Sequence, residues 1–398
     1  MFLLPLIAFV FYLFSSLNVG LALLKGFHWV AGKKGDLGNK SWFLLSSTGF
    51  LLGQGLLANF WQVLGLAWVF HATIIWIIVT IGCVLCGYLA RDLIRKIAQD
   101  IIGWMQSFTS CPKIWKALIG LLGLSAILYA IGSVVMPPAG DAEAFYMVLP
   151  KIMAESERLV PQPNYYSFTQ IGLSGELHFA ALMAIANPYL AKFYVWFTTL
   201  ALAGMLVALG TECGLGQKGQ VISLVTLLSS TTVTQYITSG KVDIFGAAFG
   251  MAAYFWALRT CRSSSKVPAV LTGLFTGLAC VAKFSNIPVV VSGVFLLILW
   301  NQMFPADQKI IPSTKTPTFV GSLILVGVCA FFAVIPHLVK NALLFGEPLA
   351  PFVFINEQGN SWADQVWFSP ETTRYILMTY PLALVFGKYP MQGGNLSV

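Results

Sequence analysis

The run WFLLSSTGFLLGQGLLANFWQVLGLAWVFHATIIWIIVTIGCVLCGYL, residues 42–89, decides the fold class of this chain. It contains no Asp, Glu, Lys or Arg. A helix needs about 20 apolar residues to cross the hydrocarbon core of a bilayer. The run is therefore long enough for two membrane-spanning helices, which we expect at 42–64 and 66–89.

Similar runs recur along the whole chain. Of the 398 residues 57% are hydrophobic and 10% are charged, and the mean hydropathy is +0.79. This composition excludes a soluble domain and predicts an all-α, polytopic membrane helical bundle with about 11 transmembrane helices. The spans are expected near 2–24, 42–64, 66–89, 117–137, 190–210, 219–237, 244–259, 268–283, 286–302, 318–336 and 374–388.

The charges of the loops orient the bundle. Short basic loops stay in the cytoplasm, and three of them fall on one side of the predicted spans. The formal net charge of +8 is mostly this topology signal and indicates no nucleic-acid binding. The long loop 138–188 then faces outward. The bases of the three loops are Lys25, Lys33, Lys34 and Lys40; Arg91, Arg95, Lys96, Lys113 and Lys116; and Arg259, Arg262 and Lys266.

The outer loop 138–188 concentrates acidic residues. A carboxylate beside a bilayer is costly unless it meets water, a cation or a reacting group, so such clustering indicates function. Apolar residues at helical spacing predict two interfacial helices, the first around 145–153 with a kink at Pro150 and the second at 173–185. Five of the 15 acidic residues of the chain lie in this loop: Asp141, Glu143, Glu155, Glu157 and Glu176.

Three further polar segments should face the same side as the outer loop. They are residues 238–243, 283–286 and 337–367. A purely structural membrane protein has no need of four polar segments that meet at one end of its bundle. We therefore expect a functional site where they meet.

The order of these segments resembles the GT-C class of integral-membrane glycosyltransferases, in its bacterial branch, which take sugars from polyprenyl-phosphate carriers. The resemblance covers residues 117–398 and no single motif in it is specific. It rests on Asp141, Tyr146 and Pro150-Lys151, on Val160-Pro161-Gln162-Pro163, Ser167-Phe168 and Glu176, on Ala191-Lys192, Val242-Asp243 and Gly277-Leu278-Ala279 to Lys283, and on Lys340-Asn341 to Pro351.

The resemblance divides the chain into N-terminal transmembrane helices with a basic linker, 1–116, and a GT-C-like module, 117–398, with the catalytic outer loop 138–188. His337 departs from the family, which more often has an aromatic residue there. The chain also stops where relatives continue into further helices. This implies a C-terminally shortened member, or half of a split enzyme whose missing helices a partner subunit supplies.

The resemblance implies a hexosyl- or pentosyltransferase of the cell envelope, in the bacterial inner (plasma) membrane with its active loop facing the periplasm or the exterior. Asp141 takes the role of general base for the acceptor hydroxyl, and Asp243 is the second catalytic acid. The alternative for both is a helix cap, and Lys241 could simply pair with Asp243. Two acids without a His cluster define no metal site; a metal bound there would be Mg²⁺ or Mn²⁺, which prefer oxygen ligands.

Basic side chains of the other segments are candidates for holding the lipid phosphate. The structural alternative is that each base is a membrane-surface anchor, that aromatic residues belong to an interfacial belt, and that His178 is a hydrogen-bonded core residue. A transporter or a catalytically silent partner subunit remains the alternative function. The expected substrate-binding residues are Glu143, Tyr146, Lys151, Glu176, His178, Lys241, Lys283, His337, Lys340 and Asn341.

Overall fold

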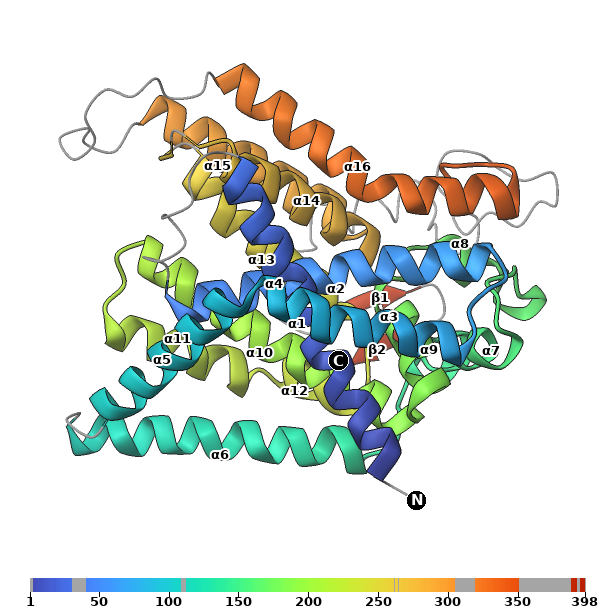
Figure 1. Cartoon of the computed structure of the whole chain (residues 1–398), viewed down its shortest axis with the longest axis horizontal. Coiled ribbons are helices and arrows are strands. Elements are labelled where there is room, and N and C mark those ends of the chain that lie inside the picture. The colour runs from blue at the N-terminus through green and yellow to red at the C-terminus, as the bar shows by residue number, and fades with distance from the viewer. Residues whose placement is uncertain are drawn as a thin grey trace.

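The computed structural model describes residues 3–30, 41–108, 112–260, 262–263, 265–304, 319–350, 388–391 and 394–397. The described part of the chain is almost entirely helical (Figure 1). Its first third holds α1 (Leu3–Val30), α2 (Trp42–Leu66), α3 (Ala72–Ile81), the π-helix η2 (Gly82–Cys86), α4 (Gly87–Leu89), α5 (Arg91–Phe108) and α6 (Lys113–Val135).

The outer loop and the following helices come next. They are η3 (Ala142–Tyr146), α7 (Val148–Ser156), η4 (Pro163–Tyr165), α8 (Tyr166–Gln170), α9 (Ser174–Ile185), α10 (Pro188–Glu212), α11 (Gln217–Ser229) and α12 (Thr231–Ser239). The last part holds α13 (Asp243–Thr260), α14 (Val267–Ala282), η5 (Ile287–Val291), α15 (Ser292–Met303) and α16 (Phe319–Phe345). A short antiparallel pair, β1 (Lys388–Met391) and β2 (Gly394–Ser397), follows.

Six helices are long and apolar enough to cross a membrane. They are α1, α2, the run Ala72–Leu89, α6, α10 and α16. The pair α11 and α12 passes the same test with a bend of 59° between them, which makes a seventh. These helices fit a multi-pass membrane protein, but the expected count of about 11 is not confirmed among the described residues. The expected span 374–388 lies almost wholly outside them.

Glycines let the first two helices touch backbone to backbone. A Cβ added at Gly53 of α2 would lie 1.8 Å from the carbonyl oxygen of Ser16, and one at Gly20 would lie 1.7 Å from that of Gly49. Only glycine permits so close an approach, which is how small residues hold helices together in membranes. The glycines of α2 are packing notches, as their position inside an apolar run predicts.

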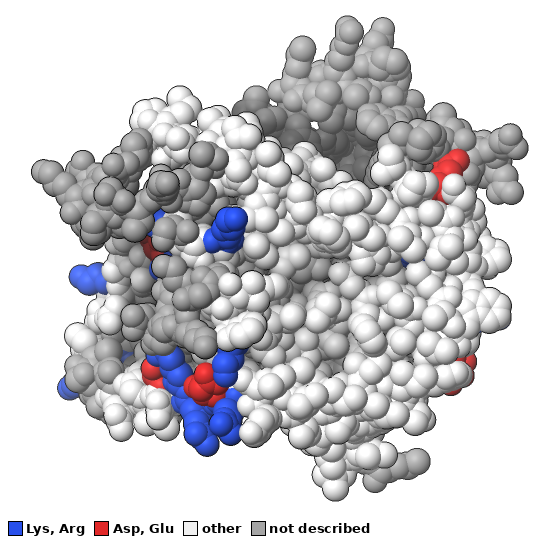
Figure 2. All heavy atoms as spheres, turned by 45° about the horizontal axis from the view of Figure 1, so that its top comes forward, with Lys and Arg blue, Asp and Glu red and all other residues white. Residues whose placement is uncertain are grey.

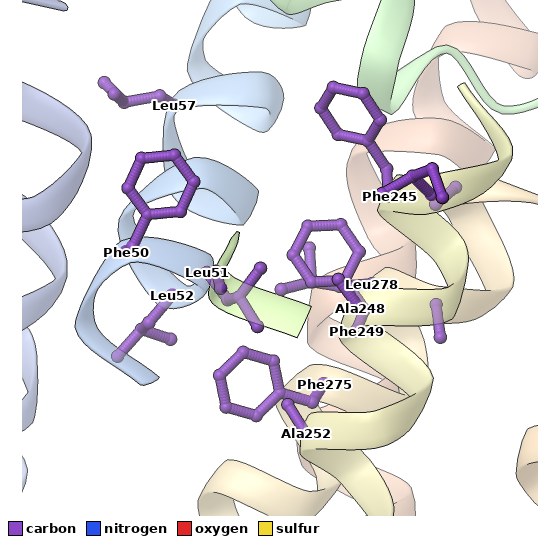
Figure 3. Close-up of a cluster of buried hydrophobic side chains, with 14 of the residues drawn as sticks. Phe50, Leu51, Leu52, Leu57, Phe245, Ala248, Phe249, Ala252, Phe275 and Leu278 are labelled. Atoms are coloured by element: carbon purple, nitrogen blue, oxygen red, sulfur yellow. The ribbon is translucent and has the colours of Figure 1, made fainter. Parts of the chain in front are cut away.

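Part of the hydrophobic core of the bundle lies between α2, α13 and α14. Figure 3 shows Leu51 of α2 on the side of that helix that faces Phe249 of α13, with Phe275 of α14 beside them. The rings of Phe249 and Phe275 stack with their centroids 6.5 Å apart. The packing of these three helices against one another also sets where their ends lie, and the polar loops follow those ends.

The polar segments separate to the two ends of the bundle. At one end Lys25 donates to the carbonyl of Leu89 and pairs with Asp92, and Arg259 pairs with Glu212. We call this the basic end. Figure 2 shows Lys and Arg gathered over one part of a face that is otherwise nearly uncharged. The opposite end, which carries the outer loop 138–188, we call the outer-loop end.

The two short helices of the outer loop pack on other helices of the bundle, α9 with nearly all of its residues and α7 with one face. Ten of the 12 residues of α9 are buried, and α9 packs on α2, α7 and α10. Met153 of α7 reaches Gly65 near the end of α2. The expected interfacial placement of both helices is therefore not confirmed. The helix is interrupted at Met147, between η3 and α7, and Pro150 lies in the first turn of α7, where proline is tolerated.

Candidate active site at the outer-loop end

Two glycines bring the first two polar loops together. Gly140, at φ +59, follows α6, and Gly240, at φ +83, ends α12 with its N–H bonded to the carbonyl of Tyr236. Glycine adopts this left-handed conformation without strain. Each glycine is followed by a charged residue, and the two meet: Nζ of Lys241 donates to Oδ2 of Asp141 at 3.2 Å. This contact joins residues 100 positions apart in the sequence.

A second ion pair lies beside the first. Lys283, in the break after α14, donates to Asp243 at the start of α13. Lys283 also lies within electrostatic reach of Asp141, Lys241 and Glu176. Three of the four expected segments therefore form one cluster with two ammonium groups and two carboxylates. The alternative pairing of Lys241 with Asp243 is wrong, because Lys283 takes that carboxylate.

Asp141 is the accessible carboxylate of this cluster. Its side chain is 55% exposed, whereas that of Asp243 is 12% exposed. Asp141 stands at the start of η3 but makes no side-chain capping hydrogen bond. The structure therefore does not show the helix cap that was the alternative role of this residue. An exposed carboxylate beside two ammonium groups can accept a proton from a polar ligand.

Tyr146 and Glu176 form the buried floor of the cluster. Burial raises the pKa of the Tyr146 hydroxyl well above its usual value, and the nearby carboxylates Glu176 and Asp141 raise it further. Burial also raises the pKa of the Glu176 carboxyl to about 8, against the attraction of Lys340 and Lys283. Among the described residues Oε2 of Glu176 has no hydrogen-bond partner. Glu176 also lines a cavity of about 20 Å³, which is room for one water.

His178 belongs to the core rather than to this cluster. Its Nδ1 lies 2.6 Å from the hydroxyl of Tyr12, and its Nε2 lies 2.9 Å from the carbonyl of Gln54. The indole of Trp61 donates to the same tyrosine oxygen at 2.8 Å. Burial lowers the pKa of His178 to about 3, so the ring is neutral. Both ring nitrogens are occupied, and the network ties α1, α2 and α9 together.

Two of the three expected ligands on α16 hold the backbone of the outer loop. The ammonium of Lys340 is fully buried and donates to the carbonyls of Thr169 and Ile171 at 2.6 and 2.7 Å. Asn341 donates to the carbonyls of Gln170 and Ala350. His337 lies one turn before Asn341, with its Nε2 3.4 Å from Nδ2 of that residue. This end of α16 thus holds in place the segment between α8 and α9. Glu176 lies directly after that segment, in the first turn of α9.

The remaining two expected ligands lie on the surface of the outer loop. Glu143 is exposed on η3. Lys151 is 64% exposed and lies 3.8 Å from Glu155 one turn further along α7. Pairs of this kind contribute little to stability and mark a solvated helix face. The structure does not bring Lys151 into the cluster.

Two neighbours of the cluster were not among the catalytic or substrate-binding residues expected from the sequence. The ring of Tyr236 lies under the ammonium of Lys241, 5.4 Å from its centroid. Lys192 of α10 is buried, donates to the carbonyl of Met136 and packs beneath Gly240. Lys192 belongs to the pair Ala191-Lys192 on which the resemblance rests, and a lysine near the start of an apolar helix is costly unless its charge meets a partner.

Neither metal ligation nor similarity assigns a role to the cluster. In the described part of the chain, no three His, Cys, Asp or Glu side chains lie close enough together to hold a metal ion. No family model, curated protein or solved structure matches the chain.

Proposed function

We propose that the chain is a membrane glycosyltransferase that moves a sugar from a polyprenyl-phosphate carrier to an acceptor hydroxyl, outside the cell. The observation that carries the proposal is the convergence of Asp141, Lys241, Asp243 and Lys283, from three separate loops, at one end of an apolar bundle. A lipid-linked donor reaches such a site from the bilayer, and its phosphate matches the two ammonium groups.

The cluster contains the groups that the reaction needs. The acceptor oxygen attacks the anomeric carbon while the bond from that carbon to the phosphate oxygen breaks. The electron pair of that bond leaves with polyprenyl phosphate, whose charge Lys241 and Lys283 offset. The proton of the acceptor hydroxyl passes to the carboxylate of Asp141, which is half-exposed beside both lysines.

The test is sugar transfer in proteoliposomes loaded with polyprenyl-phosphate hexose and pentose donors. Asp141→Asn should lower kcat by about 10²–10⁴-fold, the usual contribution of a general base. Lys283→Ala should mainly raise KM, because it removes a contact that is already made with the bound donor. Glu155→Gln, on the exposed face of α7, is the matched control. Turnover of Asp141→Asn near that of the wild type would refute the assigned base.

A transporter is the second candidate, and the bend of 59° between α11 and α12 favours it. Discontinuous helices of this kind line substrate sites in many transporters. A transporter would move an intact solute across the proteoliposome membrane and transfer no sugar from any donor. The same preparation therefore separates the two functions.

A further inference from the structure

An apolar groove opens at the basic end of the bundle, between α10, α13 and α15. Its volume is about 540 Å³. Leu258 of α13 lines it, 15 residues after Asp243 in the same helix, which is about 22 Å along the helix axis. The groove is therefore separate from the cluster at the outer-loop end. Its other lining residues are Leu209, Cys213, Tyr254, Gly293, Leu296, Leu297 and Trp300.

The lining of the groove is suited to bind a hydrocarbon chain. Apart from the Tyr254 hydroxyl, which donates to the carbonyl of Val289, and the Cys213 thiol, its lining side chains carry only the indole N–H of Trp300 as a polar group. The volume of about 540 Å³ is far larger than the space that one water needs, which leaves room for an extended hydrocarbon chain. Trp300 is 62% exposed, as aromatic residues are at the boundary between hydrocarbon and headgroups.

Two arginines, Arg259 and Arg262, lie next to this groove at the basic end of the bundle. Glu212 precedes the lining residue Cys213, and Arg259 follows the lining residue Leu258. Arg259 and Arg262 both pair with the single carboxylate of Glu212, at 2.8 and 3.3 Å. Two guanidinium groups against one carboxylate leave a positive excess.

Arg262 has donors to spare. Its side chain is 41% exposed, and among the described residues only its Nη1 has a hydrogen-bond partner. A guanidinium has five N–H donors in a planar fork that matches a phosphate. An anion could therefore accept hydrogen bonds from the other nitrogens of Arg262 while Glu212 stays paired with both arginines.

We propose that the groove binds an anionic phospholipid, with one acyl chain along α15 and the phosphate on Arg262. A groove wall is no more apolar than the surrounding lipid tails, so the chain alone gains little by entering it. The charge of the headgroup must then decide which lipid occupies the site. This inference is independent of the function proposed for the outer-loop end.

Native mass spectrometry of the delipidated full-length protein tests the proposal. Phosphatidylglycerol and phosphatidylcholine with identical acyl chains are titrated separately. We expect one phosphatidylglycerol to bind at least five-fold more tightly than phosphatidylcholine, which is about 1 kcal/mol. Arg262→Gln should remove this preference. Leu296→Trp, which fills the groove, should weaken the binding of both lipids.

Two controls separate the groove from general effects. Arg95→Gln removes an exposed base of α5, and Leu200→Trp fills another apolar groove, of about 360 Å³; neither should change the preference. If Leu296→Trp does not fold, Arg262→Gln still decides, because its exposed side chain lies outside the core. Equal affinity of the wild type for both lipids would overturn the proposal. The proposal would also fail if Arg95→Gln lowered the preference for phosphatidylglycerol as much as Arg262→Gln does.

Cys213 gives a second readout, because it lines the groove and is exposed. Phosphatidylglycerol should slow its alkylation by N-ethylmaleimide at least five-fold, measured on the peptide that contains it. Cys329 of α16 serves as the internal reference. Sodium phosphate alone should give no protection. Protection by phosphate equal to that by phosphatidylglycerol would mean that no acyl chain is seated, and the proposal would fail.

Discussion

Replacing Glu176 with glutamine should change how the stability of the protein depends on pH. The carboxyl is 3% exposed and its pKa is raised to about 8, mainly by burial. In an unfolded chain a glutamate has a pKa of about 4.3. Between these values the folded protein keeps a proton on Glu176 that the unfolded chain has lost. The folded state is therefore favoured at low pH and loses this advantage as pH rises through about 8.

The size of the effect follows from the two pKa values. Each pH unit between them is worth about 1.4 kcal/mol. From pH 5 to pH 8 the wild type should therefore lose about 4 kcal/mol of unfolding free energy relative to Glu176→Gln. Glutamine has the same shape and no charge to bury, so the variant should be the more stable protein at pH 8.

The assay is thermal unfolding in detergent at pH 5, 6, 7 and 8, for the wild type and for Glu176→Gln. The apparent Tm of the wild type should fall with pH relative to that of the variant. Glu155→Gln is the matched control, because Glu155 is 67% exposed and should follow the wild type at every pH. Parallel curves for the wild type and Glu176→Gln would refute a buried, protonated carboxyl at this position.

Three further outcomes are expected. Gly53→Val should lower the unfolding free energy by about 1–3 kcal/mol, because its Cβ would lie 1.8 Å from a carbonyl oxygen of α1; Gly120→Ala, with open space around it, should be neutral or stabilising in the same thermal assay. Tyr12→Phe should cost about 1–3 kcal/mol by leaving buried partners unpaired, with donor KM unchanged. In a cysteine-free background, an impermeant thiol reagent outside the cell should label Glu155→Cys and not Lys266→Cys; the reverse pattern would invert the topology.

The sequence alone was enough to predict a helical membrane bundle and its polar end. Long apolar runs without charge have only one stable form in a bilayer, because every backbone group must be satisfied within the segment. The glycines of α2 could be interpreted in the same way, since small residues inside an apolar run indicate close helix contact. That Asp141, Lys241 and Lys283 meet was also predictable, because each lies where an apolar run ends.

Only the tertiary structure decided which charges pair and which polar residues are buried. Lys283 takes Asp243, and Lys241 takes Asp141, because the helix ends place them so; sequence proximity favoured Lys241 with Asp243. The hydrogen bond between His178 and Tyr12, and the bond from Lys340 to the outer-loop backbone, each join residues more than 160 positions apart. Local spacing carries no information about such contacts. They arise when helices distant in the sequence pack together and each buried polar atom needs a partner.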